Sequence, residues 1–185
     1  MLHTLSRTHL TSSALPSGTV PEFEHLRSRA AIRTGLFDTG SEDRFDRITR
    51  AAAQRFDTAF SILTLIDDDR MYVKSMVGSL PREVPREVGF CNVTIQSEDG
   101  LVISDTLEHP IFSTSEFVTG PPRLRFYAGI PLRGPSGWLV GTLCIMDTQP
   151  RAFTAAGLRA LRRLADGAEL ELNSGIPGQV PQYVV

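Results

Sequence analysis

Two apolar stretches near the end of the chain constrain its fold most strongly. Residues 125–132 read Arg-Phe-Tyr-Ala-Gly-Ile-Pro-Leu, and residues 138–147 follow after the turn sequence Gly-Pro-Ser-Gly. Short apolar runs separated by a Gly- and Pro-rich turn predict two strands. Because proline has no N–H to donate to a neighbouring strand, we expect Pro131 at a sheet edge or a strand end.

Two amphipathic segments enclose the central part of the chain and are expected to be helices. The first follows a predicted N-cap at Ser41 and has apolar residues at helical spacing: Phe45, Ile48, Ala52 and Phe56. The second follows a predicted N-cap at Thr154, and its apolar stripe consists of Leu158, Leu161, Ala165, Ala168 and Leu172. Arg159, Arg162 and Arg163 lie off this stripe and are expected to face solvent.

The order of the remaining elements predicts an α+β fold. Between the helices we expect strands at 61–66, 71–77 and 101–104, a short helix at 90–96, and a long loop at 106–124. These strands and the last two form an antiparallel sheet, with the N- and C-terminal helices packed together on one face. The irregular segments 80–98 and 106–124 would cover the other face, which leaves room for a pocket.

Length and charge limit the organisation and the partners of the chain. We expect one domain at 35–173, a disordered or helical extension at 1–34 and a flexible tail at 174–185. The net charge of -2 argues against a nucleic-acid partner. No apolar run approaches the ~20 residues that cross a bilayer, and the N-terminus lacks a secretory signal. We therefore expect a cytoplasmic protein with free thiols and no membrane partner.

The sequence lacks the motifs of common catalytic and metal sites. Asp67, Asp68 and Asp69 are adjacent, but the Gly-punctuated spacing of a calcium loop does not follow, so we expect a solvated turn and no metal. Phosphate-binding loops, nucleophile elbows and zinc-protease motifs are also missing. No catalytic residue is predicted, and no pattern identifies a cofactor.

Several strings in a fixed order make residues 33–172 similar to the GAF family, and to one bacterial subgroup in particular. They are Thr34-Gly35-Leu36-Phe37-Asp38, Pro85-Arg86-Glu87, Phe90-Cys91, Val118-Thr119-Gly120-Pro121-Pro122, Phe126-Tyr127-Ala128-Gly129 and Gly141-Thr142-Leu143-Cys144. The resemblance implies a five- or six-stranded antiparallel sheet with a ligand-sized pocket. It also implies a non-catalytic sensory role in signal transduction. In that subgroup such domains often precede histidine kinase, diguanylate cyclase or phosphatase domains.

The specialised branches of the family give the alternatives. Bilin-binding members attach their chromophore through a Cys followed by His, whereas Cys91 is followed by Asn92. Haem-binding members need an axial His, and His109 lies beside a proline in a loop. The free methionine sulfoxide reductases use pocket cysteines as nucleophile and resolving partner, but Cys91 and Cys144 do not match their pattern. Because the chain nevertheless has two cysteines, a thiol-dependent reductase stays an alternative. A dimerisation module with a collapsed pocket is another.

The candidate ligand-binding residues come from the cover and from the last two strands: Phe90, Cys91, Phe112, Phe117, Arg125, Phe126, Ala128, Thr142 and Cys144. On the last strand, Thr142 and Cys144 are smaller and more polar than Leu143 and Ile145 on the opposite face, which suits a pocket wall.

Two of these candidates, Cys91 and Arg125, each have two possible interpretations. Cys91 is either a packed residue or a thiol activated at the start of a short helix. Arg125 either holds an anionic ligand or is a surface charge. The expected partners are a small molecule, a second copy bound through the terminal helices, or a signalling protein.

Overall fold

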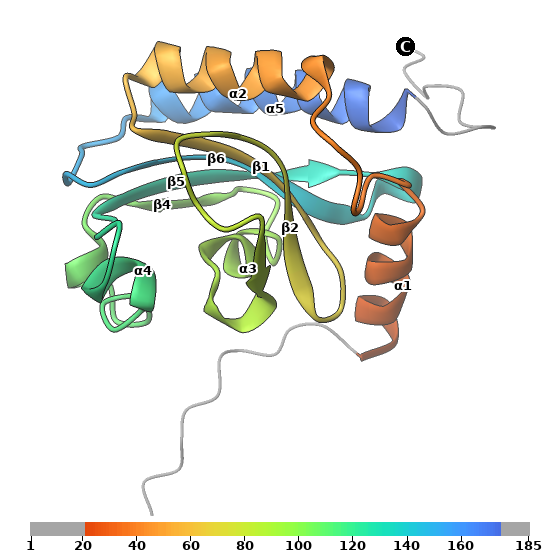
Figure 1. Ribbon diagram of the computed structural model, residues 1–185, viewed down its shortest axis with the longest axis horizontal. Helices are drawn as coiled ribbons and strands as arrows, with labels where there is room; N and C mark the ends of the chain where they lie inside the picture. The colour runs from red at the N-terminus through yellow and green to blue at the C-terminus, as the bar shows by residue number, and fades with distance from the viewer. Residues whose placement is uncertain (1–20, 175–185) are drawn as a thin grey trace, which may run out of the picture.

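A six-stranded antiparallel sheet forms the centre of the computed structural model, which describes residues 21–174 (Figure 1). The strand order is β3-β2-β1-β6-β5-β4. The strands are β1 (Phe60–Ile66), β2 (Arg70–Val77), β3 (Glu83–Pro85), β4 (Leu101–Ile103), β5 (Phe126–Arg133) and β6 (Leu139–Asp147). The β3 strand lies in the segment that the sequence predicted to be irregular.

The helices divide between the two faces of the sheet. Figure 1 shows α2 (Asp43–Phe56) and α5 (Ala155–Asn173) side by side on one face, while α3 (Phe90–Thr94) and α4 (Glu116–Thr119) lie on the other. The single-turn helices are η1 (Arg86–Val88), η2 (Thr106–Glu108) and η3 (Pro135–Gly137). The predicted α+β fold is therefore confirmed.

Helix α1 (Pro21–Ile32) confirms the helix expected in the N-terminal extension. It packs against the folded body through Arg27, which is only 5% exposed. Arg27 Nη1 donates to the carbonyl of Ile66 at 2.7 Å, and Nη2 donates to that of Asp67 at 3.0 Å. A domain boundary at residue 35 remains a prediction. The predictions for residues 1–20 and for the tail from residue 175 lie outside the described residues.

A hydrophobic core fills the space between the sheet and its two long helices. Buried side chains of α2 and α5 meet the alternate residues of β1, β5 and β6 that face them: Phe45, Ala52, Leu161, Ala165, Leu63, Leu65, Phe126, Ala128, Ile130, Leu143 and Ile145. The helical stripes predicted from the sequence supply the helix side of this core.

The two predicted helix caps have different outcomes. Thr154 caps α5, because its hydroxyl accepts from the N–H of Gly157 at 3.1 Å. The prediction of Ser41 as an N-cap is wrong, because α2 begins at Asp43. Its N-cap residue is Glu42, whose side chain makes no capping hydrogen bond. The Glu42 carboxylate instead forms an ion pair with Lys74 Nζ at 2.5 Å.

Pro131 lies at a local edge of the sheet, as expected. β4 pairs only with residues 127–129 of β5, so no neighbouring strand needs an N–H from Pro131. Its carbonyl accepts from Arg162 Nη1 at 3.2 Å. The prediction that Arg162 only faces solvent is therefore wrong, since it ties α5 to this edge.

We expect Gly167→Ala to stabilise the fold by about 0.5–1 kcal/mol, because glycine in a helix costs more conformational entropy than alanine. Gly167 lies inside α5, and a Cβ added there would meet no atom within 4 Å. Urea unfolding measures the gain. Gly157→Ala in the same helix is the control, because its Cβ would press on the Phe153 ring at 3.1 Å and offset the gain. Equal effects of both substitutions would contradict this reasoning.

Candidate functional site

A small cavity lies between the sheet and the elements that cover its second face. Its volume is about 50 Å³, which leaves room for a few water-sized groups. We call it the sheet cavity, and its lining residues are Ile62, Thr64, Met71, Val73, Leu80, Pro81, Val84, Gly89, Phe90, Cys91, Phe117, Tyr127, Cys144 and Met146. Strands β1, β2, β5 and β6 supply its floor, and the segment from Leu80 to α4 supplies its cover.

The lining of the sheet cavity is mainly apolar. None of its described lining residues is Asp, Glu, Lys, Arg or His. Its polar groups are the hydroxyls of Thr64 and Tyr127 and two thiols. An ionised ligand would lose its hydration here without gaining an opposite charge, so the cavity suits an uncharged molecule.

The sheet cavity is lined by two thiols, those of Cys91 and Cys144. Cys91 and Cys144 are both buried and free. A hydrogen bond from the Cys144 thiol lowers the pKa of Cys91 against the opposing effect of burial, and bonds from Thr142, Tyr127 and Thr64 lower it further. The same contact with Cys91, together with burial, raises the pKa of Cys144. Cys91 is therefore the thiol that ionises first.

Tyr127 and its neighbours hold the wall beside Cys91. The Tyr127 hydroxyl donates to Cys91 Sγ at 3.6 Å and lies 2.7 Å from Thr94 Oγ1 of α3. Burial raises the pKa of Tyr127 well above its usual value, so the hydroxyl keeps its proton as a donor. On the floor, Thr64 Oγ1 lies 2.9 Å from Thr142 Oγ1.

The structure brings together most of the candidate residues chosen from the sequence. Phe90, Cys91, Phe117 and Cys144 line the sheet cavity. Phe112 lies behind the wall, with its ring centroid 4.4 Å from that of Phe90. On the last strand, Cys144 faces the cavity as expected. Thr142, two residues earlier on the same face, is hydrogen-bonded to Thr64.

The prediction that Phe126 and Ala128 line the pocket is wrong, because both side chains pack in the core under α2 and α5. Successive residues of a strand point to opposite faces, so their neighbour Tyr127 faces the cavity instead. Sequence reasoning missed Tyr127, although the alternation of side chains along a strand places it on the opposite face from Phe126. It also missed the contributions of β1 and β2, such as Ile62 and Met71.

Arg125 does not reach the sheet cavity. Its guanidinium forms a forked pair with the carboxylate of Asp105, with N···O distances of 2.8 and 2.5 Å. This pair lowers the pKa of Asp105, chiefly through the hydrogen bonds. The pair fixes the start of β5 to the end of β4, so the proposed use of Arg125 for an anionic ligand lacks a free guanidinium.

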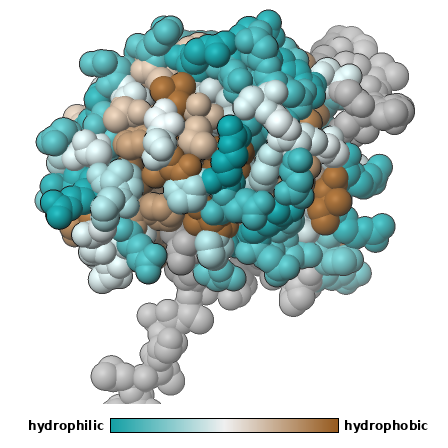
Figure 2. Space-filling view, viewed as in Figure 1, coloured by the Kyte–Doolittle hydropathy of each residue, from teal (hydrophilic) through white to brown (hydrophobic). Residues whose placement is uncertain are grey.

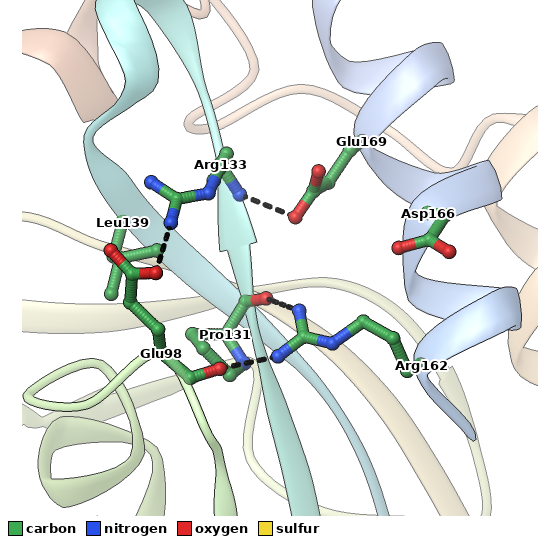
Figure 3. A pocket seen from close by; sticks show the side chains of 7 residues that line it. All are labelled: Glu98, Pro131, Arg133, Leu139, Arg162, Asp166 and Glu169. Atoms are coloured by element: carbon green, nitrogen blue, oxygen red, sulfur yellow. Dashed lines mark hydrogen bonds and ion pairs between the residues drawn. The ribbon is translucent and has the colours of Figure 1, made fainter. Parts of the chain in front are cut away.

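A second hollow lies at the far end of the sheet and is polar (Figure 3). This groove has a volume of about 230 Å³ and is lined by Glu98, Pro131, Arg133, Leu139, Arg162, Asp166 and Glu169. Glu98 forms an ion pair with Arg133 at 2.7 Å, and its carbonyl accepts from Arg162. These contacts join the turn after α3 to β5 and α5, so the charges of the groove serve to hold its walls together.

Figure 2 shows hydrophobic residues gathered near the middle of the face drawn in Figure 1, surrounded by hydrophilic ones. Among residues 21–174, no helix is both long and apolar enough to cross a membrane. Within the same range, no group of three or more His, Cys, Asp and Glu side chains is placed to hold a metal ion.

The model of a protein family described as GAF domain matches residues 41–172. The chain belongs to the GAF family. GAF domains are sensory and regulatory modules that typically bind small ligands. The matched range starts just before α2 and ends within α5, so α1 lies outside it.

One curated relative of this GAF domain is a cyclic di-GMP phosphodiesterase from Pseudomonas aeruginosa. The two sequences are 34% identical over 131 residues, which cover 71% of this chain and 22% of the relative. The chain therefore spans about a fifth of the length of that protein.

Solved structures share the fold at low sequence identity. The GAF domain of an Acinetobacter phosphoenolpyruvate-protein phosphotransferase has a TM-score of 0.59 and 15% identity, covering 81% of this chain and 92% of that one. The free methionine-R-sulfoxide reductase of Neisseria meningitidis, with its substrate, has a TM-score of 0.59 and 17% identity, covering 83% and 92%. At these identities the likeness shows the fold alone.

Proposed function

We propose that this GAF domain is a regulatory module that binds a small, uncharged molecule in the sheet cavity. One observation carries the proposal: a hollow between the sheet and a cover of short elements, lined without any Asp, Glu, Lys, Arg or His side chain. Its walls are mainly apolar, and its few hydroxyls and thiols provide the polar contacts that would orient a ligand.

The size and the neutrality of the cavity restrict the ligand. A volume of about 50 Å³ suits a molecule of a few heavy atoms. A larger ligand requires the cover to move away, and Leu80 and Phe117 are its partly buried members. An anionic nucleotide such as cyclic di-GMP finds no cation among the described lining residues, so we do not propose it as the ligand of this cavity.

A path for the signal runs from the cover to α1. Asn92 of α3 accepts from Arg86 Nε at 2.7 Å, and Arg86 Nη1 pairs with Glu24 of α1 at 2.5 Å. The pKa of Glu24 is lowered despite its burial, because Arg27 and Arg86 both donate to it. A ligand that binds one position of α3 more tightly than another would thereby also shift α1.

The relationship to the phosphodiesterase suggests the process that the module serves. We propose that the ligand controls a signalling output, with the turnover of cyclic di-GMP as the first candidate. The output is supplied by a partner protein or by a further domain, and a second copy of the chain is one such partner.

Gly89→Ala tests the sheet cavity as a ligand site. A Cβ at Gly89 would lie 1.9 Å from Met71 Cε, so the flexible methionine must shift and the wall of the cavity that both residues line must change. We expect the protein purified from its native cells to carry a small noncovalent ligand, visible as extra mass in native mass spectrometry. Gly89→Ala should lose that mass.

Gly40→Ala is the matched control, because a Cβ there meets nothing within 4 Å, and it should retain the ligand. If the wild type shows no bound mass and no thermal shift with small uncharged compounds, the proposal fails. Equal binding by Gly89→Ala would move the ligand site away from the sheet cavity.

A second candidate function is reduction of free methionine sulfoxide. Two buried cysteines beside a cavity favour it, as does the fold shared with the Neisseria enzyme. The neutral lining argues against it, because a free amino acid carries both charges at neutral pH and finds no partner among the described lining residues. Turnover of methionine sulfoxide that disappears in Cys91→Ser would establish this function, and its absence would exclude it.

A further inference from the structure

The two cysteines of the chain come from distant segments and meet at the sheet cavity. Cys91 lies in the first turn of α3, and Cys144 lies in the middle of β6. Both line the cavity, whose volume is only about 50 Å³, so the two side chains share one small space. Both are free thiols, with exposed fractions of 7% and 0%.

The surroundings of Cys91 differ from those of a cysteine that only fills space. The Tyr127 hydroxyl donates to its sulfur at 3.6 Å, in a part of the molecule that is mainly apolar, and the paired hydroxyls of Thr64 and Thr142 lie on the same face of the sheet. A donor directed at the sulfur stabilises a thiolate, which is the reactive form of cysteine. Cys144 has a raised pKa and stays protonated beside it.

We propose that Cys91 and Cys144 are a redox-sensitive pair that a small hydroperoxide converts into a disulfide within the sheet cavity. Cys91 is the attacking thiol and Cys144 the resolving thiol. This inference rests on the proposed function, since it names the class of molecule that the cavity admits. A hydroperoxide is uncharged and has few atoms, as the volume and the lining require.

The chemistry balances in two steps. The Cys91 thiolate attacks one oxygen of the O–O bond, forms a sulfenic acid, and releases an alkoxide or hydroxide that takes up a proton. The Cys144 sulfur then attacks the Cys91 sulfur, forms the S–S bond and displaces hydroxide, which combines with the Cys144 proton to give water. In total two thiols are oxidised by one hydroperoxide, which is reduced to an alcohol or water, and water leaves. A cellular dithiol reverses the change by thiol–disulfide exchange.

The disulfide would change the cover of the cavity. A disulfide holds its sulfurs about 2.05 Å apart, closer than the sulfurs of two free thiols, so its formation would draw α3 toward β6. The bond also removes the Cys91 thiolate that accepts from Tyr127. Since Asn92 follows Cys91 and bonds to Arg86, the movement reaches the ion pair between Arg86 and α1.

The test treats the reduced full-length chain with hydrogen peroxide and with an apolar organic hydroperoxide. Intact mass spectrometry should show the loss of two hydrogens, reversed by a dithiol, and peptide mapping should find Cys91 joined to Cys144 in one chain. Cys91→Ser should react on the order of tenfold more slowly, because the remaining thiol is mostly protonated. Cys144→Ser should stop at a sulfenic acid on Cys91 that a 1,3-dione traps.

Three results would overturn the inference. These are a folded wild type whose thiols do not react while the urea-unfolded chain does, first oxidation at Cys144, and disulfides only between chains. Peptide mapping of the oxidised wild type tests the inference even if one of the cysteine variants does not fold. Native mass spectrometry separates the two proposals, because a bound uncharged ligand with inert thiols contradicts only the redox inference.

Discussion

Replacing Glu42 by alanine is expected to destabilise the protein by about 3–5 kcal/mol, because it leaves a buried ammonium group without its counter-charge. Lys74 is the only lysine of the chain, and its side chain is fully buried. Its Nζ pairs with Glu42 at 2.5 Å and donates to Thr39 Oγ1 and to the carbonyl of Gly40. These two neutral acceptors replace only part of the lost attraction. Urea unfolding measures the change.

Lys74→Met is the control that separates the charge from the packing. Methionine fills a similar volume without a charge, and a buried ion pair is often worth no more than a well-packed apolar side chain. We expect a loss of about 1 kcal/mol or less for Lys74→Met, because Glu42 is then left partly in solvent. The double variant should resemble Lys74→Met. If both single variants lose the same stability, the buried charge is not the cause.

The same pair makes stability depend on pH in a known direction. The hydrogen bond from Lys74, followed by that from Arg44, lowers the pKa of Glu42 below its ordinary value of 4.5. The contribution is therefore complete above the unfolded pKa and is lost as the pH falls through the lower, folded pKa. In Lys74→Met, urea midpoints measured from pH 6 downward should fall less steeply than in the wild type.

Phe126→Ala is expected to cost about 3–5 kcal/mol, the usual loss when a fully buried phenylalanine is truncated. Phe126 has an exposed fraction of 0% and packs in the core under α2 and α5, with its ring centroid 5.5 Å from that of Phe153. Removing the ring leaves a cavity that the surrounding strands and helices cannot fill. Urea unfolding, with thermal denaturation as a second probe, measures the loss.

Tyr127→Phe is the neighbouring control on the opposite face of β5. It keeps the ring and removes the hydroxyl bonded to Thr94 and Cys91, so we expect a loss of about 1–2 kcal/mol and slower reaction of Cys91. Phe126→Ala should instead leave the reaction of Cys91 unchanged while the protein is folded. An unstable Tyr127→Phe together with a stable Phe126→Ala would reverse our assignment of the two faces.

Local patterns in the sequence predicted the elements with strong periodicity. The stripe from Leu158 to Leu172 and the cap at Thr154 were both confirmed, because α5 is amphipathic and exposes its other side. Short elements were harder to predict. The strand β3 was missed because it has only three residues and includes Pro85. The predicted cap at Ser41 was one residue too early, because the N-cap residue is Glu42, whose side chain pairs with Lys74 of a strand distant in the sequence.

The candidate site was only partly predictable, for a reason that lies in the sheet itself. A strand buried on both faces shows no alternation of polar and apolar residues, so the orientation of β5 cannot be read from Phe126 and Tyr127. Both are large, apolar over most of their surface, and fully buried. Thr142 and Cys144 were assigned to the correct side of β6 because the opposite face carries large aliphatic residues.

The amino-acid sequence alone determined the family, the α+β architecture and the helix faces that close the core, because these depend on residues a few positions apart. Tertiary structure decided what the second face forms: a small cavity that is lined by two cysteines and by no Asp, Glu, Lys, Arg or His side chain. Residues 91 and 144 are far apart in the sequence, and the polar side chains beside them, Thr64, Tyr127 and Thr142, come from β1, β5 and β6. Such a meeting depends on how α3 lies on the sheet, which no local pattern of residues specifies.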